Sequence, residues 1–480
     1  MLCALLLSAG CGVGPEENTA AAVGSAAPIE PGSPVPPELR HEPRRLIDSE
    51  NALPVLLEAG DNVSLDFGDD ALLEALGAIA EEEASYPVGE AATALDAHID
   101  ANERALALLD AALARGAIEL PKNWVLQDWD ASMKLMQVVR LAETRLGRAK
   151  RNAADGKLEQ SARDIIACGA LGELIVESRS YMHASIAGAH WRRTARIGAR
   201  WFARLADATP ALIENILEGI PRVRERQLVA DLLPQEWSVY TLPSILRVPE
   251  HADLETLGGY FSGAESPDDR HGKIYTAAFV ELLRGHPRPF DRAQTVAEGE
   301  RLYIDLLAYL RGPWKLPEFD AGEVQAVKEI WCEELYPEAA APSTTCWYPL
   351  DPPAPERLAT AREALLRYEN PAGKLLLARI LPFIERGRHF EEEADREATR
   401  AVLALRLHAA RKGAYPETLA ELVSGGILPS EPIDPFTDGP LGWSREELAL
   451  SSTGPAGDGV GLEGNELVWR VPATPPRRRP

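Results

Sequence analysis

Two histidines of this chain are spaced so that they could act together. His183 and His190 are seven residues apart in a segment predicted to be helical, so their imidazoles would face the same way, about two turns apart. Together with Glu173 and Glu177 they could line a groove, although one metal ion would need further ligands at that spacing. We favour the simpler interpretation of partly buried, hydrogen-bonded histidines.

A second candidate pair is His389 and Glu393, which are four residues apart at the start of a predicted helix near the C-terminus. A role as ligands is one interpretation, and we favour an exposed ion pair. The stretch Gly459-Val-Gly461-Leu-Glu-Gly464 satisfies the glycine pattern of dinucleotide-binding loops by letter. No helix is predicted after it and no βαβ unit surrounds it, so the match is false. The sequence contains no Walker A lysine motif, no H-E-x-x-H, no paired C-x-x-C and no G-x-S-x-G elbow.

Two tryptophans stand among carboxylates in the segment PKNWVLQDWD. Trp124 and Trp129, with Asp128 and Asp130, could form an aromatic platform for a glycan with acid–base groups nearby. Packing between helices explains the tryptophans more simply, and paired acid–base catalysis cannot be inferred without geometry.

The net charge of −24 excludes one class of partner. Nucleic-acid binding depends on clustered positive charge, and the cluster present, Arg477 to Arg479, belongs to a tail, 471–480, predicted to be disordered. We therefore expect no nucleic-acid partner.

The chain opens MLCALLLSAGC, an apolar run that ends in the small residues Ala9 and Gly10 before Cys11. The segment resembles a bacterial lipoprotein signal peptide, with a buried N-terminal strand or helix as the alternative. The resemblance implies a signal peptide over 1–10, a lipid on Cys11 as the membrane anchor, and a location in the bacterial cell envelope. Because position 12 is glycine and not aspartate, it also implies the outer membrane, with the protein facing the periplasm.

Residues 11–45 are rich in proline, glycine, alanine and serine. Such a segment cannot bury enough apolar surface to fold, so we predict a disordered tether. No later segment is predicted to span a bilayer. The best candidate, KLLLARILPFI from Lys374, carries Arg379 and Pro382. It is also much shorter than the ~20 apolar residues that a membrane span needs. We expect the body of the protein to fold outside the membrane.

Residues 46–368 are predicted to form a helical domain, an array of packed antiparallel helices. Apolar residues between 95 and 113 follow one helical face, interrupted by Asn102, and Gly116 supplies a left-handed C-cap. Thr209-Pro210 predicts the start of another helix. Residues 164–205 are predicted to form one long helix or two, and their glycines would let neighbouring helices approach closely.

Three cysteines remain beyond the N-terminal pair. Cys332 and Cys346 are separated by a stretch that contains proline and alanine, and in an oxidising compartment they could form a disulfide. Two buried thiols are the alternative. Cys168 lies in an apolar helical run and is predicted to be a core residue and not a nucleophile.

The region 369–470 carries a recognisable order of features, beginning with an apolar segment, a proline and a long amphipathic helix. The motifs that follow are Gly413-Ala-Tyr415-Pro416, Leu428-Pro429, Asp434-Pro435-Phe436, Pro440-Leu441 and a loop from Ser452 to Gly459. This order resembles the major pseudopilin, type II secretion protein G. The chain as a whole, with its Glu50-Asn-Ala-Leu-Pro54 element, is similar to a group of uncharacterised bacterial envelope proteins that carry this tail.

The pseudopilin resemblance implies a small α+β region, in which a long helix carries a few β-strands. It also implies a calcium site in the terminal loop, where Asp458, Glu463, Asn465 and Glu466 offer hard oxygen donors. Here the apolar segment lies in mid-chain and contains Lys374, Arg379 and Glu385, so we do not expect the assembly of a filament.

These features favour a lipid-anchored envelope protein that is mainly α-helical and acts as a non-catalytic scaffold or assembly factor, with other envelope proteins as its partners. An envelope hydrolase acting on glycan or peptide is one alternative, and a helical module that binds a ligand or peptide is another. Converging carboxylates and histidines in a deep pocket would favour the hydrolase, whereas a groove would favour the binding module.

Overall fold

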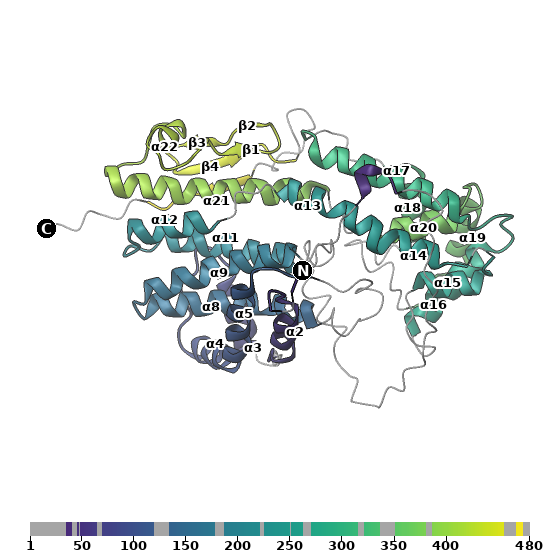
Figure 1. The fold of residues 1–480 in the computed structure, drawn as a ribbon, viewed down its shortest axis with the longest axis horizontal. Helices are drawn as coiled ribbons and strands as arrows, with labels where there is room; N and C mark the ends of the chain where they lie inside the picture. The colour runs from purple at the N-terminus through teal and green to yellow at the C-terminus, as the bar shows by residue number, and fades with distance from the viewer. Residues whose placement is uncertain are drawn as a thin grey trace. The chain divides into compact units, whose positions relative to one another are not determined.

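Every residue described below belongs to one compact unit, Val35–Pro480. The computed structural model of the protein describes residues 35–40, 46–47, 49–64, 70–119, 134–177, 187–220, 225–249, 251–262, 270–314, 321–336, 351–380, 386–455 and 467–473. As predicted, the described chain is mainly helical, with a small sheet region near the C-terminus (Figure 1).

The first group of elements runs from residue 53 to residue 219. It comprises α2 (Leu53–Asp61), α3 (Asp70–Ile79), α4 (Glu90–Ala101), α5 (Glu103–Arg115), η2 (Val138–Arg140), α8 (Leu141–Ala154), α9 (Leu158–Val176), α11 (Ala189–Ala203) and α12 (Pro210–Gly219). Helix α9 packs against both α8 and α11 and is central to this group.

The chain between 95 and 113 forms two helices and not one, because Asn102 breaks the run between α4 and α5. Asn102 is fully buried: its side-chain amide donates to His98 O at 2.9 Å, and its Oδ1 accepts from the backbone of Ser64. The predicted caps are confirmed at Gly116, which has a φ of 78°, and at Thr209, whose side chain accepts from Leu212 N.

Glycine allows the central helices to approach closely. A Cβ on Gly172 of α9 would lie 2.5 Å from Cγ of Arg192 on α11, and one on Gly198 would lie 2.9 Å from a methyl group of Leu146 on α8. The segment 164–205 therefore contributes to two helices, α9 and α11, that pack through these small residues.

A second group of elements has its own core. It comprises η1 (Pro37–Leu39), α13 (Glu225–Gln235), η4 (Glu236–Thr241), α14 (Leu242–Arg247), α15 (Leu254–Ser262), α16 (Arg270–Leu283), α17 (Arg292–Arg311), α18 (Glu323–Glu329), η5 (Ile330–Leu335), α19 (Pro355–Leu365) and α20 (Pro371–Ile380). Leu39 of η1 is completely buried in this core. The C-terminal end of the predicted tether, 11–45, is thus part of the folded body, because Leu39 supplies an apolar anchor.

The third group is the C-terminal region. It contains α21 (Arg386–Lys412), α22 (Ala420–Ser424), β1 (Ile433–Asp434), β2 (Gly439–Pro440), β3 (Gly442–Ser444), β4 (Ala449–Ser452) and β5 (Leu467–Arg470). Strands β1 and β2 form an antiparallel hairpin, and β3, β4 and β5 form an antiparallel sheet in that order. Leu450 pairs with Trp469 across β4 and β5, and both are buried.

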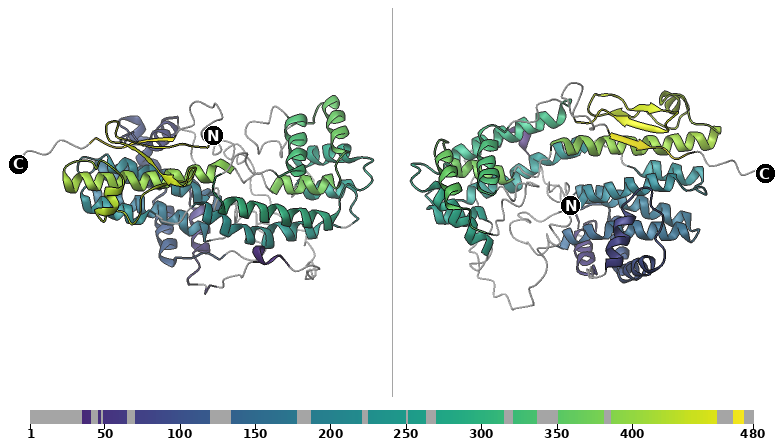
Figure 2. Two further views of the ribbon diagram at one scale, coloured as in Figure 1. Left: turned by 90° about the horizontal axis from the view of Figure 1, so that it is seen from above. Right: turned by 180° about the vertical axis from the view of Figure 1, so that it is seen from behind.

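The core does not divide at the boundary predicted between 368 and 369. Helix α20 contacts α18 and lies in the core of the second group, whereas α21 shares a core with α11 and α12 of the first. Figure 2 shows the strands lying against α21 in both views. The C-terminal region therefore packs on the first group of helices, because α21 contacts α11 and α12 of that group as well as the strands.

No helix among the described residues combines the length and the apolar character that a membrane span requires.

Candidate functional site

The structure tests the histidine pairs only in part. His183 lies outside the described residues, while His190 Nε2 contacts Glu143 Oε1 at 2.6 Å, with both side chains mostly covered. His190 is therefore a partly buried, hydrogen-bonded histidine, as favoured from the sequence. Its partner, Glu143, lies on α8. Helical spacing within residues 173–190 could not identify this partner, because Glu143 belongs to another helix.

The expectation of an exposed ion pair at His389 and Glu393 is wrong, because both residues are buried. Glu393 accepts from Arg226 Nε at 3.1 Å, and Arg226 also donates to Gly312 O at 2.8 Å. The Arg226 guanidinium lies 4.4 Å from the ring centroid of Phe390. These contacts join α13 to α21, so Glu393 belongs to a structural ion pair.

Several predicted residues lie outside the described part of the chain. They are the lipidation residue Cys11, the segment with Trp124, Asp128, Trp129 and Asp130, the calcium candidates Asp458, Glu463, Asn465 and Glu466, and Cys346. Cys332 is buried in η5 and is disulfide-bonded, and Cys346 as its partner stays a prediction. Cys168 is buried in α9, and burial raises the pKa of its thiol to about 12. Such a thiol suits a core position, as predicted.

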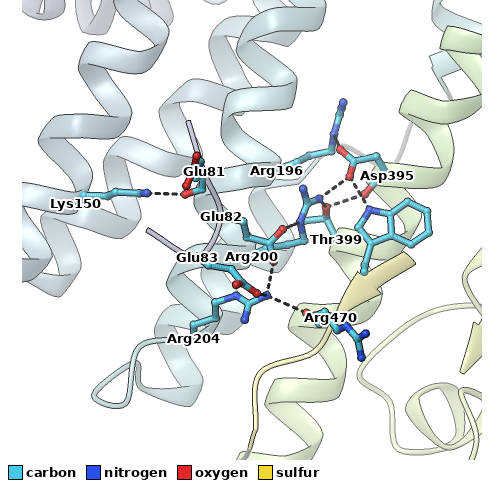
Figure 3. A network of polar contacts seen from close by, with 11 residues as sticks. Glu81, Glu82, Glu83, Lys150, Arg196, Arg200, Arg204, Asp395, Thr399 and Arg470 are labelled. Atoms are coloured by element: carbon cyan, nitrogen blue, oxygen red, sulfur yellow. Dashed lines mark hydrogen bonds and ion pairs between the residues drawn. The ribbon is translucent and has the colours of Figure 1, made fainter. Parts of the chain in front are cut away.

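Asp395 on α21, with 21% of its side chain exposed, is the centre of a largely buried network of charges that Figure 3 draws. Its carboxylate accepts from Arg196 Nε at 2.6 Å, from Arg200 Nη1 at 2.7 Å and from the indole of Trp469 at 2.9 Å. Burial alone would raise the pKa of Asp395, but the charges of Arg200 and Arg196 lower it to about 2. One carboxylate thus links α11, α21 and β5.

The same network reaches the segment between α3 and α4. Glu82 accepts from Arg200 Nε at 2.6 Å and from Arg204 Nη2 at 2.9 Å. Lys150 of α8 is fully buried and donates to the backbone oxygen of Glu81 at 2.9 Å (Figure 3). It also donates to the backbone oxygen of Ala84 at 2.9 Å. Burial lowers the pKa of Lys150 to about 8. The charged groups of Glu82, Arg200, Arg204 and Lys150 bind other groups of the protein. The network therefore holds α8 and α11 to the segment between α3 and α4.

An open groove on α5, α8 and α9 is the candidate binding site. It has a volume of about 980 Å³, at the upper end of the range of roughly 300–1,000 Å³ typical of ligand pockets. It is lined by Asp100, Glu103, Asp110, Leu113, Arg145, Arg148, Arg151, Asn152, Gln160, Arg163, Asp164, Ile166, Ala167 and Ala170. Four arginines and four carboxylates face this one groove.

Three of the four arginines of the groove belong to α8, where positions 145, 148 and 151 recur every three residues along one side of the helix, and Arg163 belongs to α9. Arg148 donates to Asp164 at 2.6 Å and 3.1 Å and to Glu103 at 3.2 Å. Arg151 contacts Asp96 at 3.2 Å and Asp100 at 2.9 Å. Burial opposes the charge of Arg148, but its bonds to Asp164 and the charge of that carboxylate raise its pKa.

Arg145 is the most buried charge of the groove, with 2% of its surface exposed. It contacts Asp110 through Nη2 and lies 3.3 Å from Asp164 through Nε. Its Nη1 is buried and has no hydrogen-bond partner among the described residues. A buried donor without a partner destabilises the protein, and a ligand that accepts from it would remove that cost.

Sequence reasoning missed the groove, although a signal was present. The run RLGRAKR places basic residues at a spacing of three on a predicted helix, in a chain of strongly negative net charge. The acidic partners come from α4, α5 and α9, so only the fold brings the two kinds of charge together.

The groove has no cluster of three metal-ligating side chains, and neither does any other place in the described ranges. Comparison with protein-family models, with curated proteins and with solved structures finds no match to this chain.

Proposed function

We propose that this protein is a lipid-anchored component of the bacterial cell envelope whose helical body is a non-catalytic docking scaffold for other envelope proteins. The observation that carries the docking role is the groove on α5, α8 and α9, in which charges of both signs line one open surface. Mixed charges of this kind supply specificity for a partner more than they supply chemistry.

The buried network around Asp395 supports the same proposal. It links α11, α21 and β5 through hydrogen bonds of 2.6 to 2.9 Å. A binding surface gains affinity when its supporting elements are held rigid before the partner arrives. The titratable residues of this network and of the Arg226–Glu393 pair serve packing, which fits a scaffold better than a hydrolase.

The anchor is proposed from the sequence alone. The first eleven residues resemble a lipoprotein signal, with Cys11 as the acylated residue and the outer membrane, facing the periplasm, as the destination. Intact mass spectrometry of the protein from its native host is expected to give a chain that begins at Cys11 and carries fatty acid. A Cys11→Ser variant is expected to keep its signal and to lack the lipid, and an unmodified native chain beginning at Met1 would contradict the anchor.

The pseudopilin-like character of the C-terminal region remains part of the proposal. The motif Asp434-Pro-Phe436 supports it as a structural unit, because Asp434 accepts from Phe436 N, from Ser452 Oγ and from Thr453 N. The motif thereby joins the hairpin β1–β2 to the end of β4. Calcium in the loop that contains Asp458 and Glu463 is proposed on the same resemblance. Addition of calcium to chelator-treated protein is expected to raise the melting temperature, and an unchanged melting temperature would remove the calcium site.

The docking role is tested by affinity capture from detergent-solubilised envelopes, followed by mass spectrometry. Arg163 is exposed at the groove, so Arg163→Glu is expected to reduce the recovery of a specific partner without unfolding the protein. Arg367→Glu, in the turn that follows α19, is the control, because Arg367 is an exposed arginine outside the groove. Equal recovery with both variants would contradict docking at the groove.

A further inference from the structure

We infer that the groove on α5, α8 and α9 recognises the free carboxylate end of a short peptide that carries a basic side chain. This inference rests on the proposed docking role, because it names the chemistry of the same groove.

Positive charge exceeds negative charge among the covered side chains at the floor of the groove. Arg145 and Arg148 both contact Asp164, whose side chain is 7% exposed. Their other carboxylate partners in the described chain are Asp110 and Glu103, with side chains 51% and 60% exposed. Two covered guanidiniums thus share one covered carboxylate. The positive charge that this carboxylate leaves unbalanced is neutralised by Asp110 and Glu103, whose exposed side chains can move into solvent.

Arg145 has a hydrogen-bond donor that no described residue uses. Its Nη1 is buried and has no hydrogen-bond partner among the described residues, while its Nη2 contacts the exposed Asp110. A guanidinium presents two parallel N–H groups to one carboxylate. If Asp110 turned outward, a ligand carboxylate could accept from both Nη1 and Nη2, and this would satisfy a donor that the protein leaves without a partner.

Asp110, once displaced from Arg145, would need a new cationic partner. Asp100, Glu103 and Asp110 are all exposed at the groove, and Asp100 pairs with Arg151 through a side chain that is 71% exposed. The carboxylate of Asp110, beside two further exposed acids, would favour a cationic group on the ligand nearby. The ligand therefore carries both signs of charge, with its carboxylate at Arg145 and its basic side chain toward these acids.

The groove is large, and part of its lining is apolar. The groove has a volume of about 980 Å³, far more than a single small carboxylate occupies. Leu113, Ile166, Ala167 and Ala170 supply apolar surface between the charged groups. A peptide of a few residues has the aliphatic atoms to cover this surface, which a free inorganic anion lacks.

The test uses isothermal titration calorimetry on the full chain with two matched probes, N-acetyl-Ala-Leu-Lys-Ala with a free carboxylate and the same peptide as its C-terminal amide. The carboxylate peptide is expected to bind about tenfold more tightly, the typical gain from one charge-assisted bidentate contact. Equal affinity for the two peptides would overturn the inference, and so would the absence of binding by either. Inorganic phosphate that bound as tightly as the carboxylate peptide would equally overturn it.

An Asp110→Asn variant provides an independent test with the opposite sign. Because Asp110 competes for Arg145, its removal is expected to tighten the binding of the lysine-free peptide N-acetyl-Ala-Leu-Ala-Ala severalfold. Asp231→Asn on α13, an exposed acid near Arg311 outside the groove, is the matched control and should leave the affinity unchanged. Weaker binding, or no change, in Asp110→Asn would contradict the displacement argument.

The outcomes separate this inference from the proposed function. If neither peptide binds while a captured envelope partner is lost in Arg163→Glu, the ligand class is wrong and docking at the groove stands. If capture does not respond to Arg163→Glu, the docking role fails, whatever the peptides do.

Discussion

Replacement of Asp395 by asparagine is expected to weaken the fold more than any loss of an exposed charge. Asp395 accepts from Arg196, Arg200 and Trp469, and the two arginines are 3% and 6% exposed. In Asp395→Asn the shape is kept, but two buried guanidiniums lose the carboxylate between them. The same change loosens β5 from α21, because the indole of Trp469 loses its charged acceptor.

The magnitude follows from the pKa of Asp395. A folded pKa of about 2, against an ordinary 3.8, corresponds to roughly 2 kcal/mol of stability supplied by the charged form at neutral pH. Removal of one partner from a buried ion pair typically costs about 3–5 kcal/mol, because the other charge is left behind. A loss of about 2–5 kcal/mol in the free energy of unfolding is therefore expected for Asp395→Asn.

Equilibrium unfolding in urea, followed by circular dichroism, measures this loss. Because the pKa of Asp395 is lowered in the folded state, its contribution is complete above pH 3.8 and disappears as the pH falls toward 2. The difference between wild type and Asp395→Asn should therefore shrink across this pH window. Asp231→Asn is the control, because Asp231 is 58% exposed and lies 3.9 Å from Arg311; it should change stability by less than about 0.5 kcal/mol. A loss in Asp395→Asn no larger than in this control would refute the role given to the network.

Three further outcomes are expected. Gly172→Ala should lower the free energy of unfolding in urea by about 1–3 kcal/mol, because its Cβ would lie 2.5 Å from Arg192 Cγ. Gly77→Ala, whose Cβ would meet open space, should be neutral or stabilising. The reverse order would contradict the close packing of α9 and α11. Asp434→Ala should accelerate hydrogen exchange at Phe436 and Thr453, whose backbone N–H groups it binds, and unchanged protection there would count against this role. Labelling of the denatured, unreduced protein should leave Cys332 and Cys346 unmodified if they form a disulfide, and labelling of both would disprove it.

The helical class and several helix ends could be predicted from the sequence because their causes are local. Thr209 caps the start of α12 through its side chain, and Gly116 caps the end of α5 because it has none. Both act within one helical turn, so the local sequence is enough to identify them. The division at Asn102 was noticed only as an interruption of the apolar pattern, because the bond that its side chain accepts from Ser64 N needs that distant segment in place.

The candidate site could not be predicted because it depends on contacts between distant segments. Arg145 and Asp164 are on neighbouring helices, but Asp110 reaches Arg145 from α5. Glu393 was misjudged as exposed for the same reason, since its partner Arg226 lies far away in the sequence. Helical spacing predicts which residues share a face, but it does not identify the segment that covers that face.

Site-specific photo-crosslinking in the native host tests the docking scaffold most directly. A photoreactive amino acid at Gln160, exposed in the groove on α9, is expected to give a discrete crosslinked product with another envelope polypeptide. The same amino acid at Glu363, whose side chain is 80% exposed on α19, should not give that product. No product at Gln160, or the same product at both positions, would contradict the proposal that this groove binds a partner.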